Sequence, residues 1–153
     1  MQELGIPFWA LLIIAFALVM LFTDIGKAYT FSEMRLEITC QGVPAVGAVV
    51  KRRIRWQKEL TDEFTADSSG VVVLPQVRER SIMQFTPSEF VASQVLVVQF
   101  SNQEFKIWIN AKRRPQNNSE LDGNPMTMKC ELSDEQRLVT DFRNSFLTNC
   151  TWK

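Results

Sequence analysis

The chain of 153 residues contains no histidine. This absence removes the usual general base, the commonest zinc ligand and every nucleophile that depends on a histidine partner. The sequence has only three cysteines, and none of them has the CxxC spacing of metal or redox sites. Phosphate-binding P-loop and GxGxxG patterns are also missing. We therefore expect a protein that is not an enzyme, with no catalytic residues, no metal, no cofactor and no small-molecule substrate.

The chain also lacks net charge, since 17 basic residues balance 17 acidic ones. No global electrostatic field draws the molecule onto nucleic acid, so we expect no nucleic-acid partner. The carboxylates of Glu89, Glu120 and Asp122 are the nearest candidates for acid and base chemistry. Such chemistry needs two carboxylates at a defined separation, so a hydrolase stays only an alternative.

Long apolar runs are scarce, and the one that occurs extends from Ile6 to Phe22 without a charged side chain. Its length of about 17 residues lies at the short end of what crosses a hydrocarbon core of roughly 30 Å. Residues 1–5 carry no Lys or Arg, which argues against a cleaved signal peptide. We expect residues 1–27 to form an uncleaved membrane anchor with one transmembrane helix in the lipid bilayer. A cleaved signal and a buried core helix are the alternatives.

The orientation of this anchor depends on two opposing signals. Lys27 and Arg35 follow the apolar run and favour a cytoplasmic domain. Against this, a bridge between Cys130 and Cys150 would close a loop of about 20 residues and stabilise the fold by roughly 3 kcal/mol in an oxidising compartment. We therefore expect this disulfide and a single-pass inner-membrane protein whose residues 28–153 lie in the periplasm. Cys40 is expected to be a small buried hydrophobic residue.

The remaining residues suffice for one domain with a single core. Period-two alternation, which is typical of half-buried strands, extends over Met34–Cys40 and Met126–Leu132. In a third strand, Ala48–Trp56, Arg52 interrupts the apolar face. Further strands are expected at Leu60–Ala66, Val71–Leu74, Val91–Phe100 and Glu104–Ile109.

The segments between these strands carry turn chemistry. Asp67–Gly70 predicts a turn in which Asp bonds its own backbone and Gly takes a positive φ. Ser101–Gln103 suits a three-residue hairpin loop, and the charged stretch from Arg78 to Pro87 predicts a loop. Ser133–Arg143 could form a short helix, and an irregular tail is the equal alternative. About seven strands separated by turns predict an all-β, Ig-like or transthyretin-like β-sandwich.

Two basic clusters are candidate partner-binding residues. Lys51, Arg53 and Arg55 project from one face of the third strand, and Lys112, Arg113 and Arg114 form the second cluster. Such clusters predict a cationic patch that meets an acidic protein surface or anionic headgroups. The alternative is a solvated sheet face or a protected edge.

The tryptophans give further expectations. Trp108 has the opposite parity from Phe105, Ile107 and Ile109, so it would point outward as a binding anchor if that apolar face lies inside. Because strands near the corners of a sandwich bury both sides, we favour core packing for Trp108 and keep it as a candidate partner-binding residue. Trp56 is predicted in the core, and Trp152 is predicted to pack over the disulfide.

Several segments resemble known families. GVPAVGAVV and TADSSGVVVLP, within Gly42–Pro75, resemble the opening of carboxypeptidase-regulatory-like or transthyretin-like sandwiches. PSEFVASQ (Pro87–Gln94), AKRRPQNNSE (Ala111–Glu120), KCELS (Lys129–Ser133) and CTW (Cys150–Trp152) together resemble a family of small, functionally uncharacterised gammaproteobacterial proteins.

This resemblance implies a small Ig-like sandwich without catalytic residues. Proteins of this build are similar to immunity proteins that accompany secreted antibacterial toxins, including type VI secretion effectors. We therefore expect a membrane-anchored domain that binds and neutralises a toxin encoded nearby. The alternative is a structural accessory subunit of a cell-envelope or secretion assembly.

Overall fold

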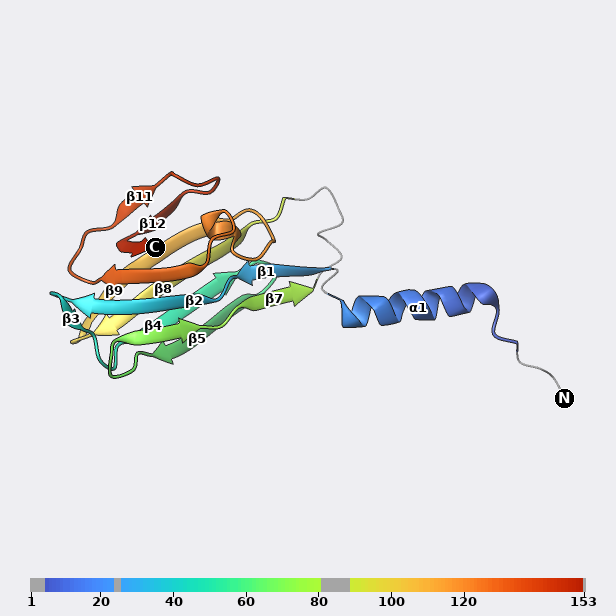
Figure 1. Ribbon diagram of the computed structural model, residues 1–153, viewed down its shortest axis with the longest axis horizontal. Coiled ribbons are helices and arrows are strands. Elements are labelled where there is room, and N and C mark those ends of the chain that lie inside the picture. The colour runs from blue at the N-terminus through green and yellow to red at the C-terminus, as the bar shows by residue number, and fades with distance from the viewer. Residues whose placement is uncertain (1–4, 24–25, 81–88, 153) are drawn as a thin grey trace.

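The computed structural model describes residues 5–23, 26–80 and 89–152, which form one helix and a β-sandwich-like domain (Figure 1). The helix is α1 (Phe8–Phe22), and a short 3-10 helix, η2 (Ser119–Leu121), lies between two strands. The strands are β1 (Lys27–Phe31), β2 (Met34–Cys40), β3 (Val43–Pro44), β4 (Val49–Arg55), β5 (Glu59–Thr65), β6 (Val71–Leu74), β7 (Val77–Arg80), β8 (Ala92–Phe100), β9 (Gln103–Lys112), β10 (Met126–Glu131), β11 (Arg137–Val139), β12 (Phe146–Thr148) and β13 (Cys150–Trp152).

Two sheets carry the core. The six-stranded sheet has the order β11-β12-β9-β8-β4-β5, and the five-stranded sheet has the order β13-β10-β2-β3 with β6 also paired to β2. β2 and β10 run parallel, whereas the other described pairs are antiparallel. β1 and β7 form a separate two-stranded sheet, which lies at the end of the domain next to α1 (Figure 1).

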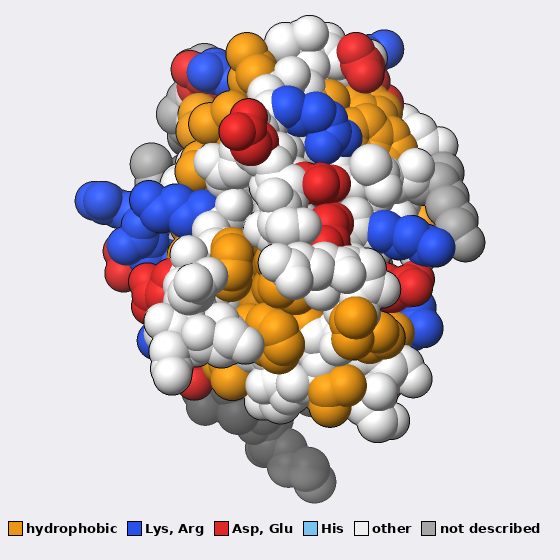
Figure 2. Space-filling model, turned by 90° about the vertical axis from the view of Figure 1, so that its left-hand side faces the viewer, with side chains coloured by type: hydrophobic (Ala, Val, Ile, Leu, Met, Phe, Trp, Pro, Cys, Tyr) orange, Lys and Arg blue, Asp and Glu red, His pale blue; other side chains and the backbone are white. Residues whose placement is uncertain are grey.

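The period-two patterns place apolar side chains between the sheets. Met34, Leu36 and Ile38 of β2 and Val50 and Ile54 of β4 are buried, as the alternation predicts. Figure 2 views the end of the domain away from α1, where hydrophobic side chains lie among charged ones of both signs. The predicted β-sandwich is confirmed at the level of its sheet arrangement.

Arg52, which interrupts the apolar face of β4, is buried with only 1% of its surface exposed. Its Nε donates to Asp62 Oδ1 at 2.9 Å and its Nη2 to Asp62 Oδ2 at 2.6 Å. The guanidinium also lies 4.7 Å from the ring centroid of Phe31 and 4.9 Å from that of Phe64. These contacts compensate the cost of burying the charge, so the face of β4 that was predicted to point inward does so despite Arg52.

Several short strands were not predicted. Of the two alternatives for Ser133–Arg143, the short helix is wrong, because β11 occupies part of an otherwise irregular segment and pairs with β12. This pairing buries Val139 opposite Phe146, a tertiary contact that outweighs the local capping signal. β7 likewise lies in the predicted charged loop, while residues 81–88, including Pro87, lie outside the described residues.

The hairpin between β8 and β9 has a shorter loop than predicted. Phe100 pairs with Gln103, so only Ser101 and Asn102 connect the strands. Both residues have positive φ, at 50° and 58°. That combination defines the type I′ turn, whose twist matches that of the flanking strands.

The predicted turn at Asp67–Gly70 is confirmed. Asp67 Oδ1 accepts hydrogen bonds from the backbone N–H groups of Ser69 at 2.8 Å and Val71 at 3.0 Å. The bond from Val71, followed by that from Ser69, lowers the pKa of the Asp67 carboxyl. Gly70 has a φ of 74°, and a Cβ there would lie 2.5 Å from the backbone oxygen of Ile38.

Replacing Gly70 by alanine should therefore lower the free energy of unfolding by about 2 kcal/mol, through the left-handed conformation and the backbone clash together. Gly42 is the matched control, because its φ is 78° but a Cβ would meet nothing within 4 Å. Gly42→Ala should cost only about 1 kcal/mol. Urea unfolding of both variants measures the difference, and equal losses would contradict the role of the clash.

Helix α1 is apolar on every side, and none of its residues is buried. It ends where Thr23 donates from both its N–H and its Oγ1 to Val19 O, at 3.0 and 2.7 Å. In Figure 1 the helix extends away from the sandwich. The alternative of a buried core helix is therefore wrong. Among the described residues, no helix combines the length and the apolar character required to cross a membrane.

Candidate functional site

The outward face of the six-stranded sheet brings one predicted cluster together. Alternation along β4 buries Val50, Arg52 and Ile54 and directs Lys51, Arg53 and Arg55 to the other side. Lys51 Nζ lies 3.7 Å from Glu63 Oε1 on β5. The three cations therefore share one solvent-facing surface, as their parity predicts.

A row of directly opposed residues crosses this sheet. Leu138 faces Leu147, Leu147 faces Ile109, Ile109 faces Val95, Val95 faces Arg53 and Arg53 faces Thr61. Residues opposed in this way point to the same side of a sheet. We call these six residues the outer-face row. Leu138 is 63% exposed and Leu147 is 36% exposed, so the row presents apolar side chains at one end and a cation further along.

The middle of the row lies in a shallow groove of about 520 Å³. We call it the sheet groove. Val95, Val97 and Ile109 give it an aliphatic lining, and the cations Lys51, Arg53 and Lys106 also line it. The other residues that line the groove are Arg52, Thr61 and Glu104. The groove thus combines an apolar surface with positive charge.

Trp108 does not belong to this surface, so it is wrong as a partner-binding residue, whereas the favoured prediction of core packing is confirmed. The register of β8 and β9 shifts between Leu96, which faces Trp108, and Val97, which faces Lys106. This β-bulge leaves Ile107 as an extra residue, so both Ile107 and Trp108 point inward and are buried. Trp108 Nε1 donates to Gln94 Oε1 at 3.0 Å.

The same bulge turns Ile109 outward into the sheet groove, although its parity with Ile107 predicts an inward position. Ile109 is therefore a residue of the candidate site that sequence reasoning missed. The sequence carries no glycine or other bulge signal between Gln103 and Lys112 that would reveal the shift.

The second predicted cluster is not a patch. Lys112 is fully buried, so it is wrong as a partner-binding residue. Arg113 Nη1 lies 2.7 Å from Glu89 Oε1 in an exposed ion pair. Arg114 pairs with Asp122 and donates to Ser119 O at 2.8 Å. Each of these cations already has an oxygen partner within the domain.

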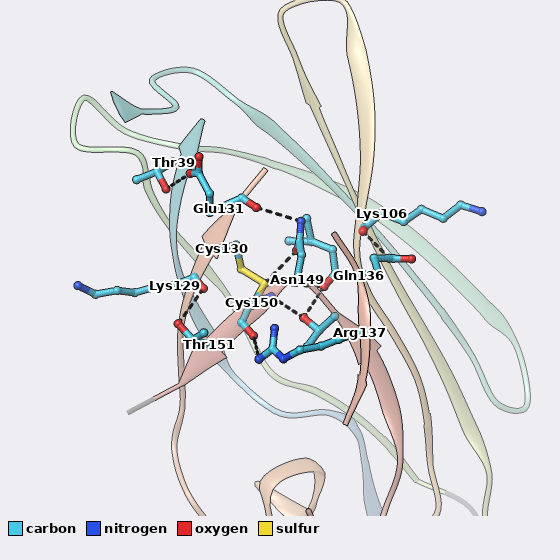
Figure 3. The surroundings of a disulfide bond; sticks show 12 residues. Thr39, Lys106, Lys129, Cys130, Glu131, Gln136, Arg137, Asn149, Cys150 and Thr151 are labelled. Carbon is cyan, nitrogen blue, oxygen red and sulfur yellow. Dashed lines mark hydrogen bonds between the residues drawn. A yellow bond between two sulfur atoms is a disulfide. The ribbon is translucent and has the colours of Figure 1, made fainter. Parts of the chain in front are cut away.

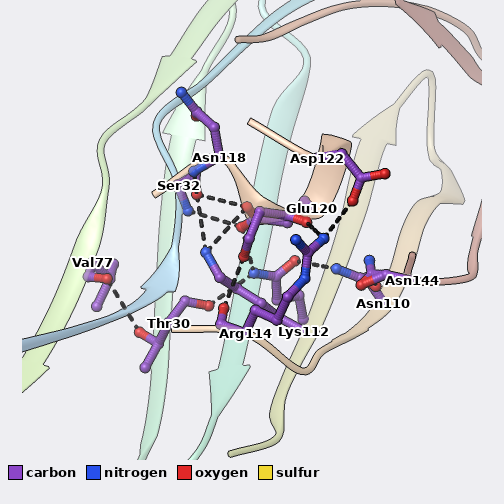
Figure 4. A network of polar contacts seen from close by, with 12 residues as sticks. Thr30, Ser32, Val77, Asn110, Lys112, Arg114, Asn118, Glu120, Asp122 and Asn144 are labelled. Carbon is purple, nitrogen blue, oxygen red and sulfur yellow. Dashed lines mark hydrogen bonds and ion pairs between the residues drawn. The ribbon is translucent and has the colours of Figure 1, made fainter. Parts of the chain in front are cut away.

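Lys112 belongs to a buried polar network around Glu120 (Figure 4). The Glu120 carboxylate accepts hydrogen bonds from Lys112 Nζ at 3.1 Å, from Ser32 Oγ at 2.6 Å and from Gln94 Nε2 at 3.0 Å. Burial raises the pKa of Glu120, but the charge of Lys112 and these bonds outweigh it and leave the pKa lowered. Desolvation in turn lowers the pKa of Lys112.

The network continues through Gln94 into the strands. Gln94 Oε1 accepts from Trp108 Nε1 and from Asn110 Nδ2, both at 3.0 Å. Asn144 Nδ2 donates to Asn110 Oδ1 at 2.9 Å. No buried side-chain nitrogen or oxygen among the described residues lacks a hydrogen-bond partner. Because Glu120 is only 1% exposed and fully engaged, we interpret this network as a structural tie between β8, β9 and η2.

The predicted disulfide between Cys130 and Cys150 is confirmed (Figure 3). The two cysteines face each other across the pair of β10 and β13. Trp152, predicted to pack over the bridge, has its ring centroid 5.4 Å from that of Phe142 and 5.7 Å from that of Phe146.

Two further predictions of burial hold only in part. Trp56 is half-buried, with its ring 4.9 Å from that of Phe90. Cys40 is a free thiol that is half-buried against the core. Within residues 5–23, 26–80 and 89–152, no group of three or more His, Cys, Asp and Glu side chains could hold a metal ion.

Comparison with known proteins gives one family. A family model described as a domain of unknown function, DUF6795, matches residues 34–135. The matched range begins at β2, includes β4, β8 and β9 with the sheet groove, and ends beyond β10. No curated protein and no solved structure matches the chain.

Proposed function

Because the chain belongs to the DUF6795 family, whose domain has no known function, we propose its function from its own surfaces. We propose a non-enzymatic, membrane-anchored protein-binding domain. The observation that carries this proposal is the sheet groove, in which aliphatic side chains and cations lie together on a rigid sheet. The buried polar side chains among the described residues all have hydrogen-bond partners, which favours binding at the surface over catalysis inside the domain.

The charges of the sheet groove favour an acidic protein partner. Lys51 has Glu63 beside it, whereas Arg53 and Lys106 have no carboxylate partner among the described residues. A partner carboxylate above Arg53 would form a charge-assisted hydrogen bond, and apolar partner atoms would cover Val95 and Ile109. Arg beside apolar contacts is a frequent composition of binding hot spots.

The proposed membrane anchor is α1. A helix that is apolar all round needs an apolar environment, and the sandwich covers none of its residues. Its 15 residues give a length of about 22 Å. Flanking residues and local thinning of the bilayer would cover the remaining thickness. The disulfide supports an oxidising compartment, so we place the domain in the periplasm of a single-pass inner-membrane protein.

Within this class, we propose immunity against a secreted antibacterial toxin, of the type VI secretion kind, as the specific role. The sheet groove would cover the active site of the toxin, and the anchor would raise the local concentration of the domain where the toxin arrives. The likeness of Gly42–Pro75 to carboxypeptidase-regulatory-like or transthyretin-like sandwiches bears on the fold, so the proposed role is argued from the surfaces of the domain. The test is genetic: cells without this chain should die when the neighbouring toxin reaches their periplasm, and their survival would refute the immunity role.

Reversing the charge at Arg53 should weaken partner binding by about tenfold, because Arg53→Glu would repel an acidic surface at the groove. Arg113→Glu is the matched control, since Arg113 is exposed but lies outside the groove and already pairs with Glu89. The measurement is the Kd of the full chain in detergent for the product of the neighbouring toxin gene. Equal Kd values for both variants would show that the partner does not bind at the sheet groove. Copurification with an envelope assembly instead of a toxin would favour the accessory-subunit role.

A further inference from the structure

A second concentration of positive charge lies at the end of the sandwich next to α1. A cleft of about 280 Å³ there is lined by Gln57, Lys58, Arg78, Glu79 and Arg80. Lys58, Arg78 and Arg80 are exposed, and Arg80 faces Lys27 across the pair of β1 and β7. We call this feature the helix-proximal cleft. It is separate from the sheet groove, with which it shares no lining residue.

Covalent connection fixes the cleft close to the end of α1. The helix ends at Phe22, and β1 begins at Lys27, so the intervening chain spans at most roughly 18 Å when fully extended. Arg80 Nη2 also donates to Thr23 O at 3.3 Å. Figure 1 shows β1 and β7 as the part of the sandwich beside the helix. A bilayer that holds α1 therefore brings its headgroups to the cleft.

Among the described residues that line the cleft, Glu79 carries the carboxylate, and it is 9% exposed. Burial raises the pKa of this carboxyl, while the charge of Lys58 acts in the opposite direction. Three of the described side chains on the exposed rim, those of Lys58, Arg78 and Arg80, carry positive charge. The guanidinium of Arg78 also lies 5.7 Å from the ring centroid of the half-buried Tyr29, an amphipathic side chain of the kind found at membrane interfaces.

We propose that the helix-proximal cleft binds the phosphate group of an anionic phospholipid in the leaflet from which α1 emerges. Lys58, Arg78 and Arg80 contact the phosphate oxygens, and the Gln57 amide donates a further hydrogen bond. A phosphate with net negative charge suits three exposed cations, whereas a zwitterionic headgroup brings its own ammonium group to the rim. This inference rests on the proposed anchoring through α1.

The test uses the full chain in lipid nanodiscs made of phosphatidylcholine with increasing fractions of phosphatidylglycerol. The rate at which an acylating reagent modifies Lys58 is followed by mass spectrometry, with Lys129 as the internal reference. Lys129 is exposed and lies on β10 of the five-stranded sheet, outside the helix-proximal cleft. Acylation of Lys58, but not of Lys129, should slow as phosphatidylglycerol increases. In Arg78→Gln, the phosphatidylglycerol fraction that gives half-maximal protection should rise by about fivefold, as expected for one lost cation at an anionic surface.

Arg53→Gln removes the same charge from the sheet groove and should leave the protection of Lys58 unchanged. Protection that is independent of phosphatidylglycerol, or that is equal in Arg78→Gln and the wild type, would overturn the proposal. Equal protection by millimolar inorganic phosphate in pure phosphatidylcholine discs would show a site for free phosphate and overturn the lipid assignment. A chain that fails to enter any disc would instead refute the anchoring through α1.

Discussion

Replacing Glu120 by alanine should lower the free energy of unfolding by about 3–5 kcal/mol, because it leaves the buried ammonium group of Lys112 without its counter-charge. Lys112 is fully buried, and within the described part of the chain its Nζ has Ser32 Oγ, at 3.1 Å, as its one hydrogen-bond partner besides Glu120. The same substitution removes the acceptor of Ser32 and of Gln94. Urea unfolding followed by tryptophan fluorescence, in mild detergent, measures the loss.

Two variants control for this result. Glu89→Ala breaks the ion pair between Glu89 and Arg113, whose side chains are 68% and 62% exposed, respectively. It should cost less than about 1 kcal/mol, because water screens both charges. The double variant Lys112→Met with Glu120→Leu replaces the pair by apolar groups and should recover most of the stability. If Glu120→Ala cost no more than Glu89→Ala, the buried network would not be a structural tie.

The pH dependence provides a second readout of the same pair. Despite its burial, the pKa of Glu120 lies below its ordinary value of 4.5, owing to Lys112 and the hydrogen bonds. The folded protein thus binds this proton less tightly than the unfolded chain does. The contribution to stability is present above the unfolded pKa and is lost as the pH falls through the folded one. The wild type should therefore lose stability relative to the double variant on acidification, and parallel curves would contradict the lowered pKa.

Removing the disulfide with Cys130→Ala and Cys150→Ala should lower the free energy of unfolding by about 3 kcal/mol, as expected for closure of a loop of this size. The bridged residues are 20 positions apart and join β10 to β13. β13 has three residues and lies at the edge of the five-stranded sheet, so few backbone hydrogen bonds hold it without the bridge. Unfolding curves of the wild type and of the double variant, with and without dithiothreitol, measure the effect.

Cys40→Ala is the matched control, because Cys40 is a free thiol only half-buried against the core. It should change the stability by less than about 1 kcal/mol. Dithiothreitol should destabilise the wild type and Cys40→Ala alike and leave the double variant unchanged. A reductant that did not affect the wild type would show that the bridge is not formed in solution.

The parts of the fold that follow from local chemistry could be predicted from the sequence. Alternation in β2, β4 and β10, the Asp67–Gly70 turn and the pairing of Cys130 with Cys150 depend on side chains near in sequence or on the small number of cysteines. The positions of Lys51, Arg53 and Arg55 on one outer face follow from the same alternation. Period-two patterns are a strong signal when one face of a strand is buried.

The failures share a physical cause, because each depends on a partner strand or partner side chain that the local residue pattern does not identify. The bulge at Ile107 changes the side of Trp108, Ile109 and Lys112, and no local pattern marks it. The burial of Lys112 is possible only because Glu120 and Ser32 converge on its Nζ atom. β11 forms because β12 supplies a ladder for it. At these positions tertiary contacts, and not local propensity, determine which side chains are buried and which segments form strands.

The parallel ladder between β2 and β10 has a consequence for biosynthesis. Thr39 and Glu131, which are hydrogen-bonded side by side, are 92 residues apart in the chain. At a translation rate of about 5–20 residues per second, β2 leaves the ribosome several seconds before its neighbour exists. The hydrophobic N-terminal helix emerges earlier still and can be recognised by the targeting machinery while the downstream polypeptide is still unfolded. Under the proposed anchoring through α1, delivery to the bilayer would precede closure of the sandwich.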